Sequence, residues 1–428
     1  MRKLALVLLL LTTPLFAQTL DQRVQAAMPS LLETYRGLHA TPELSMQEAK
    51  TSAFVAARLR ELGYEVTYPF GKYKDPSATC YGVVAILRNG AGPTVLMRSD
   101  LDGLPVAEQT GLAYASQSPG VMHACGHDVH MTTLLGTAKL LADMKSQWRG
   151  TVMLIGQPAE EVVKGADGML SEGLYEKIAR PDFAIAFHDW AVLDAGKIGY
   201  RAGQFMAATD SLNLTIRGVG GHGASPQSTK DPVVLAAETV LALQTIASRE
   251  RSPLDPVVVT VGKIEGGTKR NIIPDEVKLY LTVRTFKPEV RARVLESIQR
   301  IPRGLAIAAG VPEDRAPVYE HIGHESVAAT FNDAALTTRL VKSIANELGA
   351  ASVVEIDPAM VSEDFGLFGA DGKVPTVMLA LGAGDPAAIT AGTQPGLHSN
   401  KFAPADAALV LRTGVRAAVA GVLGLLAR

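Results

Sequence analysis

The 428-residue chain carries little net charge, and the signals for several common partners are missing from it. The formal net charge is −2, and the chain has no basic stripe, no Walker-type phosphate loop and no internal repeat. These absences give no electrostatic reason to expect nucleic acid or an anionic membrane surface as a partner. Hydrophobic residues make up 47% of the chain and charged residues 20%, which is typical of a folded globular protein. The length favours two domains, or one domain with a large insertion.

Long apolar runs occur only at the two ends of the chain. The C-terminal run covers residues 407–428 and contains Arg412 and Arg416. Two arginines within the run favour a buried amphipathic helix over a membrane span.

The N-terminal run has the features of an export signal. Arg2 and Lys3 precede an apolar stretch at residues 4–11, and the small residue Ala17 follows. This pattern predicts a secretory signal peptide at residues 1–17. A membrane anchor is the alternative, but the stretch is shorter than the roughly 20 apolar residues that a spanning helix needs. We therefore expect cleavage, a periplasmic or secreted protein, and no membrane contact afterwards.

The first half of the mature chain alternates between helical and strand patterns. Apolar positions recur at spacings of three and four over residues 21–38, 46–62 and 129–145, which predicts helices. Buried strands are predicted at YGVVAIL, PTVLMRSDLDG, GTVMLIGQPAEE and FAIAFHDW. This order predicts an α/β fold in which a central mixed sheet is flanked by helices.

The pattern changes after residue 204. Strands at DSLNLTIRG, PVVVTVGKIEGG, EVKLYLTVRTF and PVYEHIG alternate with helical patterns at residues 231–249 and 288–309. The order strand-helix-strand-strand-helix-strand predicts a ferredoxin-like α+β unit. We therefore expect a discontinuous catalytic domain, residues 18–204 and 317–428, with a second domain inserted at residues 205–316.

The two cysteines have different surroundings. Cys80 opens the strand YGVVAIL, whereas Cys125 lies among histidines in MHACGHDVHM. In an exported protein they could form a disulfide. Cys125 and His127 are separated only by Gly126, whose backbone can turn tightly enough for a thiolate and an imidazole to face one divalent ion. The tripeptide alone leaves metal binding, a disulfide and core packing open.

Two adjacent carboxylates strengthen the metal interpretation. Glu160 and Glu161 follow an apolar strand, where burying both is costly unless a positive group lies beside them. A solvated acidic turn is the alternative. A division of labour would explain the pair, because one glutamate could bind a metal ion while the other takes a proton from a metal-activated water.

Two further histidines complete a candidate ligand set. His188 ends the strand FAIAFHDW, and His398 lies in a loop flanked by glycine and proline. Each alone could be an ordinary core or turn residue. Ligand sites of α/β sheets lie beyond the carboxyl ends of the strands, so we expect these residues to meet there. Five ligand-type side chains are enough for two metal ions that share one bridging ligand: Cys125, His127, Glu161, His188 and His398.

The chain resembles the M20 family of metallopeptidases, most closely its amidohydrolase branch. That branch includes hippurate hydrolases, N-acyl-amino-acid amidohydrolases and auxin-conjugate hydrolases. The resemblance covers nearly the whole mature chain and is carried, in order, by LHATPELSMQE, MRSDLDGLPV, MHACGHDVHM, GQPAEE, FHDW, GVGGHGASPQ, TVGKIEGGTKRNIIPDEV, TVRTF, SEDF and LHSNKF.

The resemblance implies a role for each member of the ligand set. Cys125 would bridge two divalent ions, and His127 and His188 would each bind one of them. Glu161 and His398 would complete the coordination. The metal could be Mn, Zn, Co or Ni, because affinity alone does not select among these ions.

The resemblance also implies catalytic roles. Glu160 would act as the general base and acid. Asp100 matches the aspartate of the family's H-x-D motif and would orient the ligands without binding metal. Arg98 occupies the histidine position of that motif and is not expected to be a ligand.

The inserted unit would be the family's lid or dimerisation domain. His222 would help to polarise the scissile carbonyl, and Asn271 and Arg284 would hold a substrate carboxylate. Two segments depart from the family: HATPELS has alanine and threonine where relatives often carry basic residues or histidine, and Gln227 stands where relatives usually have histidine. Both departures could alter the rim of the substrate site.

The predicted function is metal-dependent hydrolysis of the amide bond of N-acyl amino acids, such as N-acetyl or N-benzoyl derivatives, or of short peptides. A carboxypeptidase or dipeptidase of the same family is the alternative. A hydrolase with Cys125 as nucleophile would explain neither the paired glutamates nor His398. A non-enzymatic solute-binding protein would not need Glu160. The partner is expected to be a small molecule, and the lid could form a homodimer.

Overall fold

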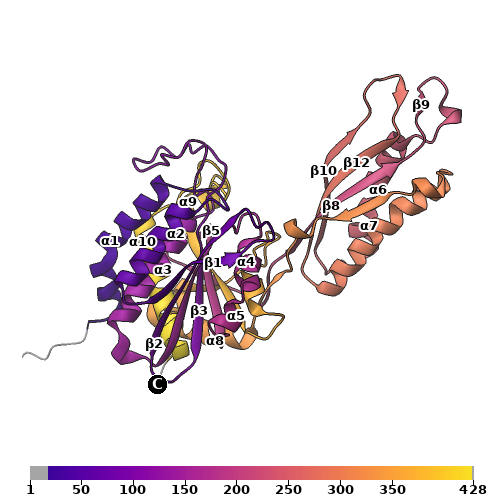
Figure 1. Cartoon of the computed structure of the whole chain (residues 1–428). Helices are drawn as coiled ribbons and strands as arrows, with labels where there is room; N and C mark the ends of the chain where they lie inside the picture. The colour runs from indigo at the N-terminus through magenta and orange to yellow at the C-terminus, as the bar shows by residue number, and fades with distance from the viewer. Residues whose placement is uncertain (1–17, 427–428) are drawn as a thin grey trace, which may run out of the picture.

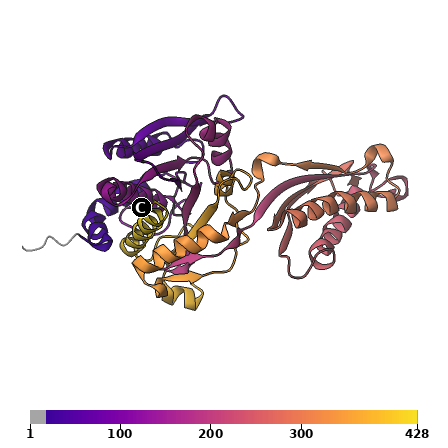
Figure 2. The same ribbon diagram turned by 90° about the horizontal axis from the view of Figure 1, so that it is seen from below.

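The computed structural model describes residues 18–426, which form two domains (Figure 1). The larger domain contains both the N-terminal and C-terminal segments, and the smaller one projects from it (Figure 2). The predicted signal peptide at residues 1–17 lies outside the described residues. The structure therefore has the discontinuous arrangement that the sequence predicts.

The larger domain is built on an eight-stranded mixed sheet with the order β1-β2-β4-β3-β5-β16-β6-β15. The central neighbours β4, β3, β5 and β16 run parallel, whereas β1, β2 and β6 join antiparallel neighbours. Their bounds are β1 Glu65–Lys72, β2 Thr79–Asn89, β3 Thr94–Asp100, β4 Gly150–Gln157, β5 Phe183–Asp194, β6 Ile198–Tyr200, β15 Val353–Glu355 and β16 Thr376–Gly384.

Helices cover both faces of this sheet because the side chains of each strand alternate between two cores. Val95 and Met97 of β3 face one core, and Leu96 faces the other. The first core is covered by α1 (Leu20–Ala40), α2 (Ala49–Glu61), α3 (His127–Asp143), α8 (Ala334–Leu348) and α10 (Ala407–Leu426). The second is covered by α4 (Gly165–Ser171), α5 (Leu174–Lys177) and the 3-10 helix Phe365–Gly369. The short helix α9 (Pro386–Ala391) follows β16.

The C-terminal apolar run forms α10, as predicted. Among the described residues it is the one helix long and apolar enough to cross a membrane, but most of that stretch is buried inside the protein. It packs against α1, α3 and α8. Its two arginines leave the core, because Arg412 forms an ion pair with Asp21 and Arg416 bonds to Glu347. Its burial and these contacts are typical of a helix in the core of a domain.

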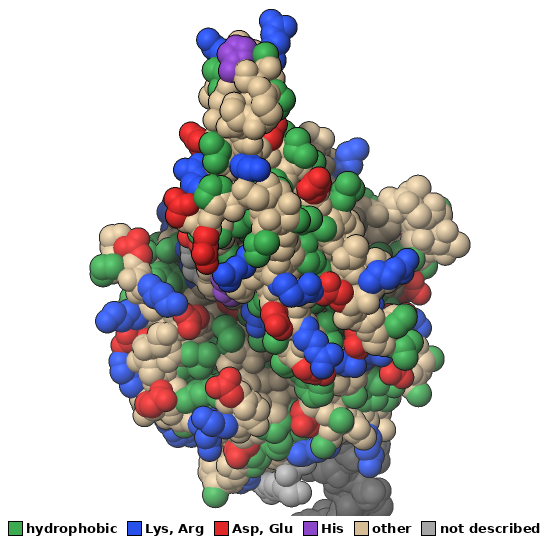
Figure 3. Space-filling model, turned by 90° about the vertical axis from the view of Figure 1, so that its right-hand side faces the viewer, with side chains coloured by type: hydrophobic (Ala, Val, Ile, Leu, Met, Phe, Trp, Pro, Cys, Tyr) green, Lys and Arg blue, Asp and Glu red, His purple; other side chains and the backbone are tan. Residues whose placement is uncertain are grey.

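The inserted domain has the predicted ferredoxin-like order. Its antiparallel sheet is ordered β10-β12-β8-β13 and has its own core with two helices. The last strand lies a few residues beyond the predicted limit at residue 316. Charged side chains of both signs are interspersed on the face shown in Figure 3. The elements are β8 Ala208–Arg217, α6 Pro232–Arg249, β10 Val257–Gly266, β12 Glu276–Thr285, α7 Pro288–Ala308 and β13 Val318–His321.

Two short strand pairs mark the ends of this domain. Near its junction with the larger domain, β7 (Gly203–Met206) pairs with β14 (Thr330–Asn332). At the other end, β9 (Gly221–His222) pairs with β11 (Ile272–Ile273). Figure 1 shows β9 at the end of the inserted domain that is remote from the eight-stranded sheet.

Candidate metal centre

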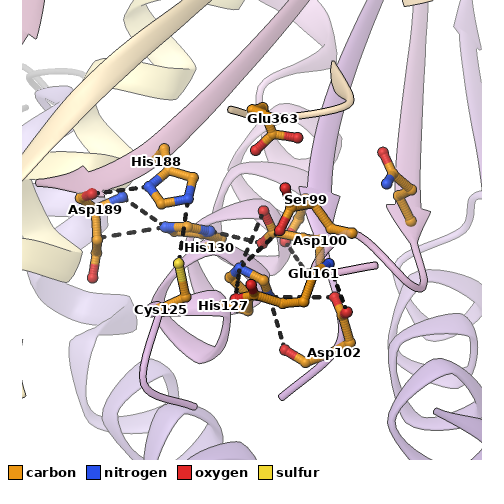
Figure 4. A network of polar contacts seen from close by, with 12 residues as sticks. Ser99, Asp100, Asp102, Cys125, His127, His130, Glu161, His188, Asp189 and Glu363 are labelled. Atoms are coloured by element: carbon orange, nitrogen blue, oxygen red, sulfur yellow. Dashed lines mark hydrogen bonds and ion pairs between the residues drawn. The ribbon is translucent and has the colours of Figure 1, made fainter. Parts of the chain in front are cut away.

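The proposed ligands come from separate segments and lie together beyond the carboxyl ends of the central strands. Figure 4 shows four of them, Cys125, His127, Glu161 and His188. Cys125 lies in the loop before α3, and His127 is the first residue of that helix. Gly126 between them has φ +84°, and a Cβ there would lie 2.4 Å from a carboxylate oxygen of Asp189. Only glycine fits this turn, so the sequence C-G-H places both side chains on the same side.

The five proposed ligands form overlapping groups. The ligand atoms of Cys125, His127 and His188 lie within 4.8 Å of one another, and so do those of Cys125, Glu161 and His398. The Cys125 Sγ is 3.7 Å from His188 Nε2, and Glu161 Oε2 is 3.4 Å from His398 Nε2. Cys125 belongs to both groups, which is the arrangement expected of a bridging ligand.

The loop that carries His398 is tied to the loop that carries the cysteine. The backbone N–H of His398 donates to the carbonyl oxygen of Ala124 over 2.8 Å. His398 has φ +65°, a conformation that residues other than glycine rarely adopt. This contact places an imidazole from the C-terminal part of the chain beside Cys125.

The polar atoms at the centre of the site fit divalent cations. His127 donates from Nδ1 to the carbonyl oxygen of Asp102 over 2.7 Å, which leaves the lone pair of Nε2 free. That Nε2 and Oε1 of Glu161 are buried and lack any hydrogen-bond partner. They lie 3.7 Å apart. Unpaired buried acceptors are costly, and a cation between them would remove the cost.

Burial of Cys125 disfavours its thiolate form, which a bound cation would stabilise. Desolvation raises the pKa of Cys125 well above its ordinary value, and the charges of Glu161 and Glu160 raise it further. Burial likewise raises the pKa of Glu161 to about 7. Divalent ions would reverse these effects by favouring the thiolate and the carboxylate, so metal binding should release protons.

Glu160 is placed to move a proton at this centre. Its side chain is buried, and Oε2 lies 3.8 Å from Nε2 of His127. Burial raises its pKa, and the charges of Glu363 and Glu161 add to the effect. A carboxylate with a raised pKa is a stronger base than an exposed one, which suits it to general acid–base work.

Asp100 supports the ligands through other residues. Its Oδ1 accepts a hydrogen bond from Nδ1 of His130 over 2.7 Å, and Nε2 of His130 in turn accepts the backbone N–H of Asp189. These bonds fix His130 between β3 and the residue that follows His188. Oδ2 of Asp100 accepts from Arg98 Nη1 over 2.6 Å.

Arg98 holds buried carboxylates together. It donates to Asp100 and also to Glu363 (2.8 Å) and Asp364 (3.2 Å), both in the segment after the inserted domain. Glu363 also faces the site, because one of its oxygens lies within 4.8 Å of a carboxylate oxygen of Asp100 and a ring nitrogen of His188. Glu363 was not predicted to be a site residue. The motif SEDF was its only signal.

Four of the five proposed ligands, Cys125, Glu161, His188 and His398, line a cleft of about 720 Å³ that extends to the inserted domain. Arg284 lines this cleft and donates to Ser362 Oγ over 2.5 Å. Burial lowers the pKa of the Arg284 guanidinium. The ordinary pKa of arginine is so high that the group nevertheless stays positively charged. The apolar lining includes Val162, Trp190, Met206, Met360, Val361 and Leu397.

Two predicted lid residues are not brought to this cleft within one chain. His222 and Asn271 lie where β9 and β11 pair, at the remote end of the inserted domain (Figure 1). The backbone N–H of Gly223 donates to the carbonyl oxygen of Asn271 over 2.9 Å, which holds the two segments together. Cys80, for its part, lies buried in the second core and forms no disulfide with Cys125.

Comparisons with known proteins agree with this geometry. The model of peptidase family M20/M25/M40 matches residues 96–418. The N-acetyl-L-cysteine deacetylase of Bacillus subtilis is 38% identical over 339 residues, which cover 79% of this chain and 77% of the relative. Among similar solved structures, two match nearly the whole chain. A candidate aminohydrolase from methicillin-resistant Staphylococcus aureus has a TM-score of 0.83 at 31% identity, covering 95% of this chain and 99% of that one.

The second structure is a dinuclear metal-binding M20 peptidase from Bacillus subtilis. It has a TM-score of 0.76 at 28% identity and covers 94% of this chain and 99% of its own. A match over three quarters of the sequence, the shared two-domain fold and a buried cluster of metal-ligand side chains lead to one conclusion. The chain belongs to peptidase family M20/M25/M40 and is a metal-dependent amidohydrolase.

Proposed function

We propose that this protein hydrolyses the amide bond of N-acyl amino acids or short peptides at a centre that holds two divalent ions. The proposal depends most on one observation: Cys125, Glu161, His188 and His398 line one cleft together with Glu160, and the buried His127 lies against them. The relatives named N-acetyl-L-cysteine deacetylase and N-acyl-L-amino acid amidohydrolase support this substrate class. The metal would be Mn, Zn, Co or Ni.

The side chains of the centre have separable tasks. When bound, the two ions would polarise the amide carbonyl and acidify water. Glu160 accepts the proton of the attacking water on its carboxylate and returns it to the nitrogen of the leaving amine. Asp100 and Asp102 keep the imidazoles of His130 and His127 in fixed tautomers during these transfers.

The cleft supports a substrate with one apolar end and one anionic end. Trp190, Met206 and Leu397 offer apolar surface for an acyl group near His188. Arg284 offers a guanidinium, which binds carboxylates in a two-pronged geometry. An N-acyl amino acid carries these two features on either side of its amide bond.

The position of the lid tip supports a dimer. The strand β9, which contains His222, lies remote from the eight-stranded sheet (Figure 1), so His222 can act on a substrate only after a large lid movement or from a second chain. The outer edge of β10 has no strand partner among the described residues, and such an edge can pair with another copy. We therefore propose a homodimer through the lid. The export signal predicted at residues 1–17 supports a periplasmic or secreted location.

Removing and restoring metal tests the proposed function. The purified mature protein is stripped with a chelator, and hydrolysis of N-acetyl, N-benzoyl and indoleacetyl amino acids is followed together with that of dipeptides. We expect activity to disappear and to return with Mn²⁺, Zn²⁺, Co²⁺ or Ni²⁺. Full activity after verified metal removal would instead support a Cys125 nucleophile. Hydrolysis of dipeptides alone would favour the peptidase alternative.

A further inference from the structure

The motif PELSMQE, residues 42–48, has no role in the site described so far, yet it contacts two segments that form the site, the loop after β3 and the turn at Glu160. We call this segment the brace. It runs alongside the loop after β3, with a parallel bridge between Leu44 and Gly103, and the backbone N–H of Gly103 donates to the carbonyl oxygen of Glu43 over 2.7 Å. The brace ends at Glu48, the residue that precedes α2, and the side chain of Glu48 is fully buried.

Glu48 reaches the turn that carries the proposed general base. Its Oε1 accepts the backbone N–H of Ala159 over 2.7 Å and that of Met46 over 2.8 Å. Ala159 immediately precedes Glu160 and has φ +52°, and Met46 has φ +66°. Both residues thus adopt a left-handed conformation that is unfavourable for side chains with a Cβ, and one carboxylate oxygen secures both.

A second buried carboxylate holds the other side of Glu160. Oδ2 of Asp102 accepts the backbone N–H of Glu161 over 3.0 Å (Figure 4). The same oxygen accepts the hydroxyl of Ser45, a residue of the brace, over 2.6 Å. The brace therefore reaches the turn directly through Glu48 and indirectly through Ser45 and Asp102.

The carbonyl groups of the turn are also occupied. The carbonyl oxygen of Ala159 accepts the N–H groups of Lys164 and Gly165, and that of Glu160 accepts the N–H of Val163 over 2.7 Å. With both flanking N–H groups held by carboxylates, little freedom remains for the backbone of Glu160. This fixes the direction of its Cα–Cβ bond, from which the side chain reaches the cleft.

We propose that Glu48 is a positioning residue for Glu160: its carboxyl group fixes the strained backbone of Ala159 and thereby aims the general base. This inference rests on the proposed function, because it assumes that Glu160 moves the proton. It differs from a purely structural role in what it predicts. Misaiming a base slows the chemical step and leaves substrate binding and metal binding largely intact.

Three variants of the full mature protein test the proposal. Glu48→Met has a similar length but no acceptor, so it leaves the N–H groups of Ala159 and Met46 unpaired. Glu48→Gln keeps a carbonyl oxygen for both. Glu43→Met is the matched control, because Glu43 belongs to the same brace but its side chain accepts the N–H of Thr51, outside the site; its backbone bond to Gly103 is kept.

For each variant kcat, KM and metal content are measured with the best substrate of the screen. We expect Glu48→Met to lower kcat by about 10- to 100-fold, with KM and metal content near those of the parent. Glu48→Gln and Glu43→Met should keep kcat within about threefold of the parent. Parental kcat in Glu48→Met, a rise in KM without a fall in kcat, or an equal loss in Glu48→Gln would overturn the proposal.

Two further measurements keep the outcomes distinct. If Glu48→Met does not fold or lacks metal, Glu48→Asp decides: it keeps a carboxylate that is one methylene too short, so the same fall in kcat is expected, and parental kcat overturns the proposal. Glu160→Gln is measured in parallel. An active Glu160→Gln would refute the proposed mechanism itself, whereas an inactive one beside a fully active Glu48→Met would refute only the role of the brace.

Discussion

The metal centre and the tip of the lid differ in how firmly their polar residues are held. At the centre, His127, His130 and Asp100 are buried and bonded to fixed partners from several segments. At the tip, His222 is exposed and lies on a strand of two residues. The buried centre is held in place by contacts within one chain. Under the proposed mechanism the chemistry resides in this centre, and His222 would complete the site only when the tip of a lid is brought to a substrate.

Removing the proposed base should have the largest effect on that rigid part. Glu160→Gln keeps the shape of the side chain but cannot accept a proton, so kcat should fall by about 10²- to 10⁴-fold. Metal content, measured by elemental analysis, should stay at the parental level. A variant whose kcat lies within about tenfold of the parent would show that another group moves the proton.

The two cysteines offer a matched pair for the next test. Cys125→Ala removes the thiolate shared by both ligand groups, so the protein should lose at least one ion on dialysis and much of its stabilisation by metal. Cys80→Ala removes a buried thiol of the second core and should change stability but not metal content. Equal metal content in both variants would contradict the bridging role.

A substitution of Arg284 tests whether the inserted domain binds the substrate carboxylate, because Arg284 lines the cleft. Arg284→Met should raise KM for N-acyl amino acids by about 10- to 100-fold, because a charge-assisted contact to the carboxylate is lost. The difference should disappear for substrates whose carboxylate is replaced by an amide. Arg249→Met, at the exposed end of α6, serves as the control and should leave KM unchanged. An equal rise in KM for the neutral substrates would argue against carboxylate binding.

The remote tip can be tested by mixing. His222→Ala and Glu160→Gln should each be nearly inactive, but a mixed dimer has one cleft with an intact Glu160 and an intact His222 from the partner. Activity should therefore rise when the two inactive proteins are exchanged and mixed. If the mixture is no more active than its components, His222 does not act across chains.

The smallest expected effect concerns stability rather than chemistry. His39 is buried between Asp128 and Glu108 at 2.7 and 3.2 Å. Although burial lowers the pKa of His39, the two carboxylates outweigh it and raise the pKa to about 9. A raised histidine pKa stabilises the fold fully below about pH 6.5, its ordinary value, and the gain is lost as the pH rises through about 9.

Thermal unfolding measured from pH 6 to 10 should show this loss in the parent. His39→Gln should remove that part of the pH dependence. An unchanged slope in the variant would mean that His39 is neutral in the folded protein.

The sequence predicted the larger elements because their patterns are local. The strands β3 and β4 are continuous apolar runs that end in polar residues, and the order of strands and helices in the lid is specific enough to predict its fold. The edge strand β1 was not predicted. It contains Pro69 and Gly71, which weaken any strand pattern and are tolerated because β1 pairs on one side only.

The residue types that come together at the candidate site could be predicted from the sequence. The contacts that hold these residues in place could not. Cys125 and Glu161 stand out because a thiol beside histidine and paired carboxylates are unusual at strand ends. Arg98 with Glu363, and Glu48 with Ala159, depend on contacts between segments more than 100 residues apart, and no local pattern encodes such contacts. Nor does a local pattern say which end of an inserted domain faces the cleft, which is why His222 was expected at a site it does not reach within one chain.

The central claim is that two cations share the sulfur of Cys125, and anomalous scattering tests it most directly. Crystals of the protein loaded with Zn²⁺ or Mn²⁺ should show two strong anomalous peaks, one on each side of Cys125 Sγ, with His127, His188, Glu161 and His398 distributed around them. A single peak, or peaks away from Cys125, would contradict the account.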